Sequence, residues 1–309
     1  MEEKKRLIII DSNALLHRSF HALPPLTTKK GEQTGAVYGF LLTLFKAIKD
    51  LKPNYIIACF DTAAPTFRHK QFKEYKAQRP KTSEELITQI PKTKQVLTSF
   101  NIPVFEKEGF EADDLIATIS QKASKEKLEV YILSGDLDNL QLVNENIKVY
   151  TLGKGIKETV VYDREKVKTR FEVEPEQMND FKALIGDPSD NIPGVLGIGK
   201  KTAAELLKKF NNLENLYQEV KKDNPEIKAK TKETLLKNKE QAFLSRSLVE
   251  TKKDVALNIN VTECEFGKFD CQKVESILKE LEFFTLINRV PLLIPGSDSP
   301  VSNLKLLNH

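Results

Sequence analysis

Nine acidic residues have the types and spacing of a metal-binding cluster. Three of them end apolar runs, which read LIIID to position 11, YIIACFD to position 61 and VYILSGD to position 136. The others occur in EADD at 111–114, two residues after Asp136, and in DPSD at 187–190. The nine are Asp11, Asp61, Glu111, Asp113, Asp114, Asp136, Asp138, Asp187 and Asp190. Each motif alone has an ordinary explanation as a helix cap or a turn, so the case for a site rests on their combination.

Carboxylates forced together destabilise a fold unless cations neutralise them. Because no histidine adjoins these acids in sequence and Cys59, before Asp61, reads as a core residue, Mg²⁺ or Mn²⁺ is expected rather than zinc. Two such ions can activate a water and stabilise the leaving oxygen of a phosphodiester. Two-metal phosphodiester hydrolysis is therefore the expected chemistry.

The elements that must position these acids form an α/β pattern. The three apolar runs suit buried strands, and helical stripes at 37–48, 86–100 and 115–120 lie between or beside them. This alternation predicts a mostly parallel central sheet, in which ligands bind beyond the carboxyl ends of the strands. Asp11, Asp61 and Asp136 would then face one crevice.

The chain is predicted to become helical from about residue 175. Short helices are expected at 176–185, 201–210, 213–220 and 241–249, a late strand at 254–261 and a closing helix at 270–281. The expected organisation is an α/β core at 1–173, a helical subdomain at 174–290 and a tail or linker at 291–309.

Composition excludes several classes of protein. The 309 residues are 40% hydrophobic, enough for a sizeable core, and no apolar run approaches the roughly 20 residues of a membrane span. The N-terminus lacks the long apolar segment of a secretory signal, so a cytoplasmic location is expected. Three cysteines, without a Cys-x-x-Cys, argue against a disulfide framework or a cysteine zinc site. The net charge is only +4, but the residues other than the nine acids carry a clear excess of positive charge, which suits a DNA-binding surface.

Residues 66–82 form a basic segment, TFRHKQFKEYKAQRPKT. Lys70, Lys73 and Lys76 recur at three-residue steps, close to one face of a helix, with Phe72 and Tyr75 interleaved. Cations can grip phosphates while an aromatic ring stacks on a base. The alternative is a solvated helix whose aromatic rings point inward.

Residues 192–203, IPGVLGIGKKTA, lead into a predicted helix whose first amides could hold a DNA phosphate. Gly194, Gly199 and Lys200 match a nucleotide-binding loop, but Lys201 occupies the position of its metal-binding Ser or Thr. A sequence-independent phosphate clamp is therefore preferred to a nucleotide triphosphate pocket. A plain turn between helices remains a further alternative.

Five motifs together resemble the 5′ nuclease family, which includes flap endonucleases and the N-terminal 5′ to 3′ exonuclease domain of bacterial DNA polymerase I. They are FDxxxxTFR at 60–68, YKxxRP at 75–80, EADD at 111–114, SGDxD at 134–138 and GDPSDNIPG at 186–194. The similarity covers about residues 6 to 290. It departs from the family at Ser12, usually glycine, and at Leu137, frequently lysine.

The resemblance implies a PIN-like nuclease core with a helical arch at about 66–100 and a helix-hairpin-helix-like subdomain. Asp11, Asp61, Glu111 and Asp113 or Asp114 would surround one Mg²⁺ or Mn²⁺, with Asp136, Asp138, Asp187 and Asp190 around a second. The implied catalytic residues are Asp61, Asp136, Lys76 and Arg79, the last two at the scissile phosphate. Tyr75 would stack on a terminal base, with Arg18, Arg68 and Lys70 nearby. Gly194, Gly197, Gly199, Lys200 and Lys201 would grip the duplex, with a potassium ion held by the loop.

The implied activity is structure-specific 5′ to 3′ exonuclease or flap endonuclease cleavage in DNA replication and repair. The implied partners are DNA with 5′ flaps, nicks or RNA primers and a DNA polymerase, with the chain acting as a monomer. Two alternative functions are a catalytically silent module that binds branched DNA and a nucleotide triphosphatase that uses the glycine-rich stretch.

Overall fold

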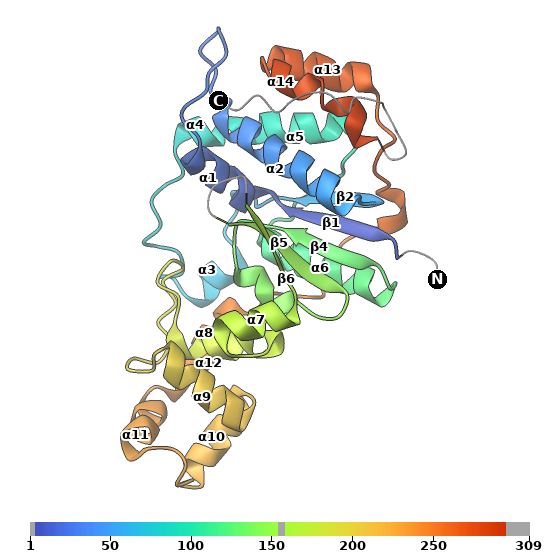
Figure 1. Ribbon diagram of the computed structural model, residues 1–309. Helices are drawn as coiled ribbons and strands as arrows, with labels where there is room; N and C mark the ends of the chain where they lie inside the picture. The colour runs from blue at the N-terminus through green and yellow to red at the C-terminus, as the bar shows by residue number, and fades with distance from the viewer. Residues whose placement is uncertain (1–3, 154–157, 295–309) are drawn as a thin grey trace.

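The computed structural model describes residues 4–153 and 158–294, and Figure 1 shows a central sheet with helices on both faces. The six strands lie in the order β3-β2-β1-β4-β5-β6, and only β6 is antiparallel to its neighbour. They are β1 (Arg6–Asp11), β2 (Tyr55–Cys59), β3 (Val104–Phe105), β4 (Glu129–Leu133), β5 (Ile147–Leu152) and β6 (Thr159–Tyr162). The predicted α/β class with a mostly parallel sheet is confirmed.

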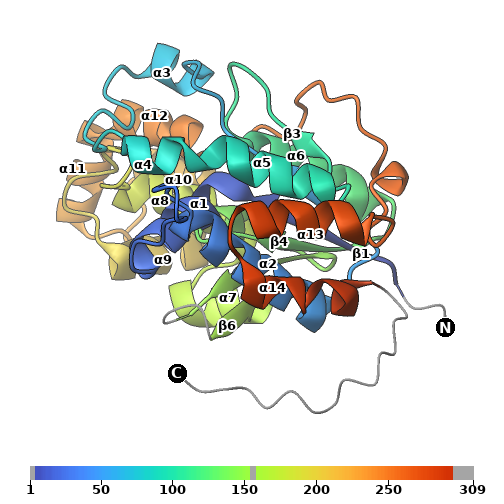
Figure 2. The same cartoon turned by 90° about the horizontal axis from the view of Figure 1, so that it is seen from above.

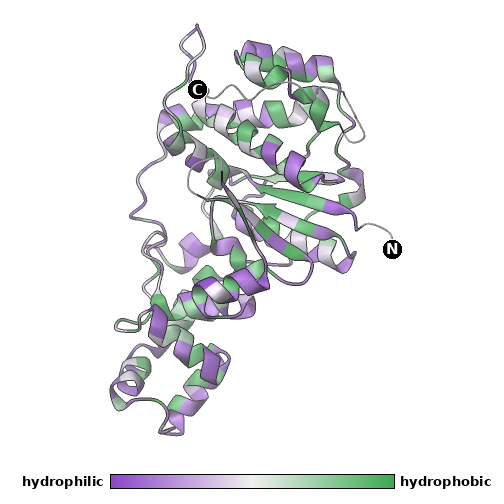
Figure 3. Cartoon of the chain, in the orientation of Figure 1, coloured by the Kyte–Doolittle hydropathy of each residue, from purple (hydrophilic) through white to green (hydrophobic). Residues whose placement is uncertain are grey.

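Alternate residues of the strands enter two separate cores, because successive side chains of a strand point to opposite faces. Ile8 and Ile10 of β1 pack with the helices on one face, and Leu7 and Ile9 pack with those on the other. The first face is covered by α1 (Ser12–Ala22), α2 (Gly35–Leu51), α5 (Gln89–Ser99) and α13 (Cys271–Glu280), which Figure 2 shows lying over the sheet. The second face is covered chiefly by α6 (Ala112–Lys125). The strands are therefore apolar on both sides, as the hydropathy colouring of Figure 3 shows.

The chain changes direction across the sheet at β1. From β1 it continues to β2 and β3 on one side, and it then returns to β4 on the other side of β1. In an open parallel sheet, this switch creates a crevice beyond the carboxyl ends of the strands. The acids that follow β1, β2 and β4 lie at this edge.

The predicted arch at 66–100 is helical only in part. These residues contain α3 (Phe67–Gln71), a stretch of turns at 73–79, α4 (Glu84–Ile87) and α5, and α5 belongs to the layer on the sheet. The single helical face predicted from Lys70, Lys73 and Lys76 is absent, because α3 ends at Gln71 and Lys76 has a left-handed φ of 56°. Three-residue spacing of lysines on a polar segment does not by itself require a helix.

The helices expected after residue 175 are present. They are α8 (Met178–Ile185), α9 (Lys200–Phe210), α10 (Leu213–Lys221) and α12 (Lys239–Val249), preceded by α7 (Arg164–Phe171) and the 3-10 turn η2 (Pro175–Gln177). A further helix that the sequence analysis did not predict, α11 (Ala229–Lys237), lies between α10 and α12. Helices α9 to α11 extend away from the sheet at the bottom of Figure 1. No helix in the described part of the chain is long and apolar enough to cross a membrane.

The last described segments return to the core, which differs from the predicted helical subdomain at 174–290. Val274 and Leu278 of α13 pack in the same core as α2 and α5, together with α14 (Phe284–Ile287). The 3-10 helix η4 (Val290–Leu293) also packs there, so the predicted tail does not begin at 291; residues 295–309 of that prediction lie outside the described residues. The predicted strand at 254–261 is absent: this stretch is extended but joins no sheet, and the 3-10 helix η3 (Val261–Glu263) follows it.

Candidate active site

Asp11 is held at the centre of the crevice by its position in the chain. It is the last residue of β1 and also the N-cap of α1, where its Oδ1 accepts a hydrogen bond from the amide of Ala14 at 3.2 Å. Its Oδ2 accepts a hydrogen bond from Ser134 Oγ, at the end of the neighbouring β4, at 2.6 Å. The strand-to-helix turn therefore fixes this carboxylate between two strand ends. Asp11 is only 4% exposed.

Asp61 and Asp113 reach the same space from other elements. Asp61 follows β2, and its Oδ1 accepts a hydrogen bond from the amide of Ala112 at 2.7 Å, at the start of α6. Asp113 belongs to the first turn of α6, and Asn139 Nδ2 donates to its Oδ1 at 3.1 Å. Helix amides and the buried Asn139 thus orient carboxylates that come from distant parts of the sequence.

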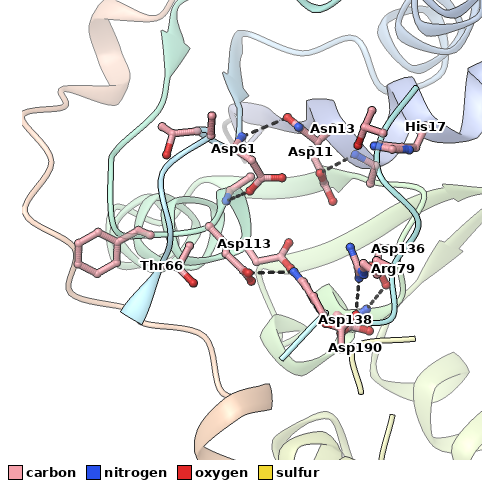
Figure 4. A pocket seen from close by; sticks show the side chains of 18 of the residues that line it. Asp11, Asn13, His17, Asp61, Thr66, Arg79, Asp113, Asp136, Asp138 and Asp190 are labelled. Carbon is pink, nitrogen blue, oxygen red and sulfur yellow. Dashed lines mark hydrogen bonds and ion pairs between the residues drawn. The ribbon is translucent and has the colours of Figure 1, made fainter. Parts of the chain in front are cut away.

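These side chains line one open pocket of about 860 Å³. Figure 4 shows labelled aspartates from different elements turned toward this common space. Seven of the nine predicted acids line the pocket: Asp11, Asp61, Glu111, Asp113, Asp136, Asp138 and Asp190. Asp114 and Asp187 do not line it.

Asp114 has a different role from the predicted one. Both of its oxygens accept hydrogen bonds from the Arg68 guanidinium, at 2.8 and 2.9 Å, and its side chain is 0% exposed. Arg68 also donates to the carbonyls of Leu248 and Glu250. This buried ion pair joins α3, α6 and the end of α12, so Asp114 is saturated by the protein, and Arg68, only 2% exposed, is not available to DNA.

Tyr75 also differs from expectation. Its ring is buried, at 3% exposed, and its hydroxyl lies 3.1 Å from Glu111 Oε2 and 3.3 Å from Asp190 Oδ2. A ring in this position cannot stack on a base, since its faces are covered by protein. Tyr75 instead supports two pocket acids from behind.

Lys76 and Arg79 lie at the pocket, as the sequence motif placed them, but they contact acids there. Lys76 Nζ donates to Glu111 Oε1 at 2.9 Å, and Arg79 pairs with Asp190. The turns of residues 73–79 bring both side chains to the pocket, whose lining includes them. These basic groups partly neutralise the acids in this structure.

Sequence reasoning missed Lys182. This lysine of α8 pairs with Asp138 and donates to Asp187 Oδ2 at 2.9 Å. Burial would lower the pKa of Lys182, but the charges of Asp138 and Asp187 raise it above its usual range. Its one sequence signal is a lysine inside the short helix that leads to the DPSD motif.

The remaining residues predicted to contact DNA differ in their exposure. Arg18 is half-buried and donates to the carbonyls of Leu152 and Gly153, whereas Lys70 is exposed on α3. In the glycine-rich loop, Gly199 is the N-cap of α9, and Gly197, Lys200 and Lys201 are exposed beside it.

Gly194 is buried, contrary to its expected contact with the duplex. Its amide donates to Ser245 Oγ at 3.1 Å, and a Cβ there would lie 2.2 Å from the backbone nitrogen of Gly186. With a φ of 63°, Gly194 serves a close approach of two backbone segments. The stretch before the loop is a turn after α8 and not a strand, which removes the structural context of a nucleotide-binding loop.

Because the pocket acids are buried and close to one another, their ionised forms are unfavourable when no cation is bound. Burial, reinforced by the charge of Asp136, raises the pKa of Asp11 to about 7, despite the hydrogen bond from Ser134. Burial and the charge of Asp11 raise the pKa of Asp113 well above its usual range. Burial raises the pKa of Asp138 to about 6, although Lys182 opposes the shift. Positive charge added to the pocket would therefore stabilise the ionised forms.

The donor chemistry fits hard divalent cations. The pocket offers carboxylate oxygens from several elements, and Thr62 Oγ1 and Asn139 Oδ1 are buried beside them without a hydrogen-bond partner within the described structure. No group of three or more histidine, cysteine, aspartate or glutamate side chains in the described residues is already gathered around one ion position. Lys76, Arg79 and Lys182 instead hold several of the acids in ion pairs.

The raised pKa values predict how pH affects stability in a chelator. Below about pH 4 the acids are protonated in both the folded and the unfolded protein, and their burial carries no ionic penalty. As the pH rises towards 7, the unfolded chain ionises first, so the free energy of unfolding falls; the shift of Asp11 alone corresponds to roughly 4 kcal/mol. Urea unfolding in EDTA at pH 5 and pH 8 measures the part of this loss that falls above pH 5.

Magnesium should oppose that loss, because bound cations favour ionised carboxylates. The stabilisation by Mg²⁺ is expected to be larger at pH 8 than at pH 5. An equal effect of Mg²⁺ at both pH values would contradict the assignment of the buried acids to a cation site.

Solved structures with a similar fold include a T5 5′-exonuclease and the catalytic core of Rad2. The T5 D15 protein, co-crystallised with metal ions, superposes with a TM-score of 0.66 at 21% identity, covering 89% of this chain and 99% of that one. The catalytic core of Rad2, in a complex with a DNA substrate, gives a TM-score of 0.62 at 16% identity over 94% of this chain and 93% of that one. At these identities the likeness establishes the fold.

Sequence comparison establishes the family. The model of the 5′-3′ exonuclease N-terminal resolvase-like domain matches residues 6–172, and that of the 5′-3′ exonuclease C-terminal SAM fold matches residues 173–272. The chain belongs to the 5′-3′ exonuclease family, as the resemblance of its motifs indicated.

Two relatives illustrate the extent of the match. A 5′-3′ exonuclease of Aquifex aeolicus (strain VF5) is 40% identical over 286 residues, which are 93% of this chain and 95% of the relative. DNA polymerase I of Bacillus subtilis (strain 168) is 41% identical over 299 residues, 97% of this chain. The chain spans about a third of the length of such polymerase relatives.

Proposed function

We propose that this chain is a structure-specific 5′ to 3′ exonuclease and flap endonuclease that hydrolyses DNA and RNA-primer phosphodiesters near 5′ ends during replication and repair. The observation that carries the proposal is the gathering of seven acids, Lys76 and Arg79 around one open pocket at the switch point of the sheet. Membership in the 5′-3′ exonuclease family supports the polarity of cleavage.

The residues that would hold two Mg²⁺ or Mn²⁺ ions divide into two groups. Asp11, Asp61, Glu111 and Asp113 surround the ends of β1 and β2 and the start of α6, and they are proposed for the first ion. Asp136, Asp138, Asp187 and Asp190 are proposed for the second. Asp114 is left out, because Arg68 occupies both of its oxygens. Water activation and stabilisation of the leaving oxygen are the chemistry that such ions supply when bound.

The basic residues have a separate task in this proposal. Lys76 and Arg79 neutralise Glu111 and Asp190 in the structure described above, and added cations would weaken those ion pairs. Their side chains would then be free to contact the scissile phosphate. Gly197, Gly199, Lys200 and Lys201, at the exposed start of α9, are proposed to hold the duplex backbone, with a potassium ion at the loop.

The proposed setting follows from the relatives. Several of them are DNA polymerase I proteins, so a DNA polymerase, as a neighbouring domain or a separate protein, is the proposed partner. We place the activity in the cytoplasm, on chromosomal DNA, with one copy of the chain acting on each branched end.

The test is incubation of the chain with a duplex that carries a labelled 5′ flap. Cleavage near the flap junction is expected with Mg²⁺ and should stop in EDTA. No cleavage, or cleavage that EDTA does not affect, would contradict the proposal. A chain that binds the flap without cutting it in any divalent cation would instead be a silent branched-DNA-binding module.

Replacing Lys76 separates transition-state contact from docking. Lys76→Ala is expected to lower the single-turnover cleavage rate about 100-fold while changing flap affinity less than about 3-fold, since a phosphate contact that strengthens in the transition state affects rate more than binding. Lys73→Ala, which removes an exposed lysine three residues away, is the matched control and should change neither. Equal losses of rate and affinity in Lys76→Ala would make this lysine a docking contact.

A further inference from the structure

Lys182 differs from the other basic residues at the pocket because a helix holds it in place. It lies in the middle of α8, between Phe181 and Ala183, which are both buried in the core. Its side chain is 16% exposed, whereas that of Arg79 is 47% exposed. Arg79 lies on a segment of turns, and it can turn away from the acids without any change in the core. The core packing of α8 fixes the backbone position of Lys182, and its side chain is more enclosed than that of Arg79.

The ammonium group of Lys182 joins two acids that are separate in the sequence. Asp138 follows β4 and Asp187 follows α8, and both carboxylates contact Nζ of this lysine. Asp187 is also fixed by Ser189, whose hydroxyl donates to Asp187 Oδ1 at 2.6 Å. In the absence of Lys182, these two carboxylates would face each other with little positive charge nearby to offset their repulsion.

The position of this charge matters for any divalent ion at the same acids. A fixed positive charge repels a nearby cation, and it also occupies carboxylate lone pairs that a metal ion would use. Two charges of +1 and +2 a few ångströms apart interact by more than 1 kcal/mol even in a water-like dielectric. Among the acids proposed for the first ion, Glu111 also has a buried basic neighbour, since Arg68 Nη1 lies 3.4 Å from its Oε2, but Arg68 is shared with both oxygens of Asp114.

We propose that Lys182 is a built-in counter-cation of the second ion group, which holds Asp138 and Asp187 together and weakens divalent-ion binding there. The inference rests on the proposed function, since that function assigns Asp138 and Asp187 to an ion. Lys182 is thus a positioning residue that acts through these two acids and sets the affinity of the group for its ion.

Calorimetric titration with Mn²⁺ alone, in the absence of DNA, tests the inference. The wild-type chain should bind one ion at least about 10-fold more tightly than a second. Lys182→Gln keeps a hydrogen-bond donor for the acids and removes the charge, so the second affinity should rise about 10-fold or more. Lys182→Arg keeps the charge and should leave the affinity for the second ion low. Lys253→Gln removes an exposed lysine elsewhere, and its affinities should match those of the wild type.

The outcomes separate this inference from the proposed function. Unchanged or weaker second-ion binding in Lys182→Gln would overturn the role of Lys182 while leaving the nuclease proposal intact. Absence of Mn²⁺ binding in the wild type would overturn both. If Lys182→Gln does not fold, the wild-type titration still decides, because two ions bound with equal affinity contradict a counter-cation at one of them.

Discussion

Asp113→Asn is expected to abolish cleavage and, in EDTA, to raise the midpoint of thermal unfolding. Asparagine has the same shape and keeps the acceptor for Asn139, but it cannot carry the charge that attracts a cation. Flap cleavage should fall about 1000-fold or more, with flap binding retained. Asparagine cannot ionise, so the cost of burying a carboxylate beside Asp11 and Asp136 is removed and the midpoint should rise by about 2 to 4 °C.

The paired measurements are single-turnover cleavage with Mg²⁺ and calorimetric unfolding in EDTA. Asp254→Asn, an exposed aspartate away from the pocket, is the matched control and should change neither result. A variant that cleaves normally would remove Asp113 from the site. A variant that loses cleavage only because it unfolds at a lower temperature would show that Asp113 is structural.

Arg68→Met is expected to lower the free energy of unfolding by about 3 to 5 kcal/mol. The substitution leaves Asp114, which is 0% exposed, without its bidentate partner, and an unpaired buried charge has a penalty of this size. It also leaves the carbonyls of Leu248 and Glu250 without their donors. Urea unfolding measures the effect, and Lys70→Met, at an exposed position two residues away, should change stability by less than about 0.5 kcal/mol.

A second substitution tests the cause of that loss. In Arg68→Met with Asp114→Leu, both charges of the bidentate pair are removed, and apolar replacement of a buried ion pair is often neutral. The double variant should therefore recover a large part of the stability that Arg68→Met loses. If Arg68→Met unfolds at the same urea midpoint as the wild type, Arg68 has no structural role. A contact with DNA would then explain Arg68 better.

The sequence predicted the sheet and the acid cluster well because both depend on local patterns. Apolar runs that end at Asp11, Asp61 and Asp136 indicate buried parallel strands, and parallel strands bring their carboxyl ends to one edge. No knowledge of distant contacts was needed for that inference. The family motifs then narrowed the expected substrate to DNA near 5′ ends.

The partners of individual charges were not predictable in this way. Arg68 binds Asp114 across 46 residues, and Lys182 binds Asp138 across 44. A basic residue near such a motif has the same sequence pattern whether it faces DNA or a buried carboxylate. Only tertiary packing separates the exposed Lys70 from the buried Arg68.

The missing strand at 254–261 has a different cause. Val255 and Ile259 are buried, and Leu257 between them packs against the same core, so the alternation correctly indicates one buried face. Alternation reports which side chains are buried but not whether a neighbouring strand offers a hydrogen-bonding edge. Here the nearest pairing is an isolated bridge between Tyr55 and Glu265.

The central claim is that the acids at the strand ends bind divalent cations, and iron-mediated backbone cleavage tests it most directly. Fe²⁺ that replaces Mg²⁺ in the pocket reduces added hydrogen peroxide to hydroxide and a hydroxyl radical, and the radical cuts the polypeptide next to the ion. Added ascorbate returns the resulting Fe³⁺ to Fe²⁺. Cuts are expected near Asp11, Asp61, Asp113 and Asp136, and excess Mg²⁺ should suppress them. Cuts confined to other acidic segments, or cuts at these positions that Mg²⁺ does not suppress, would contradict the claim.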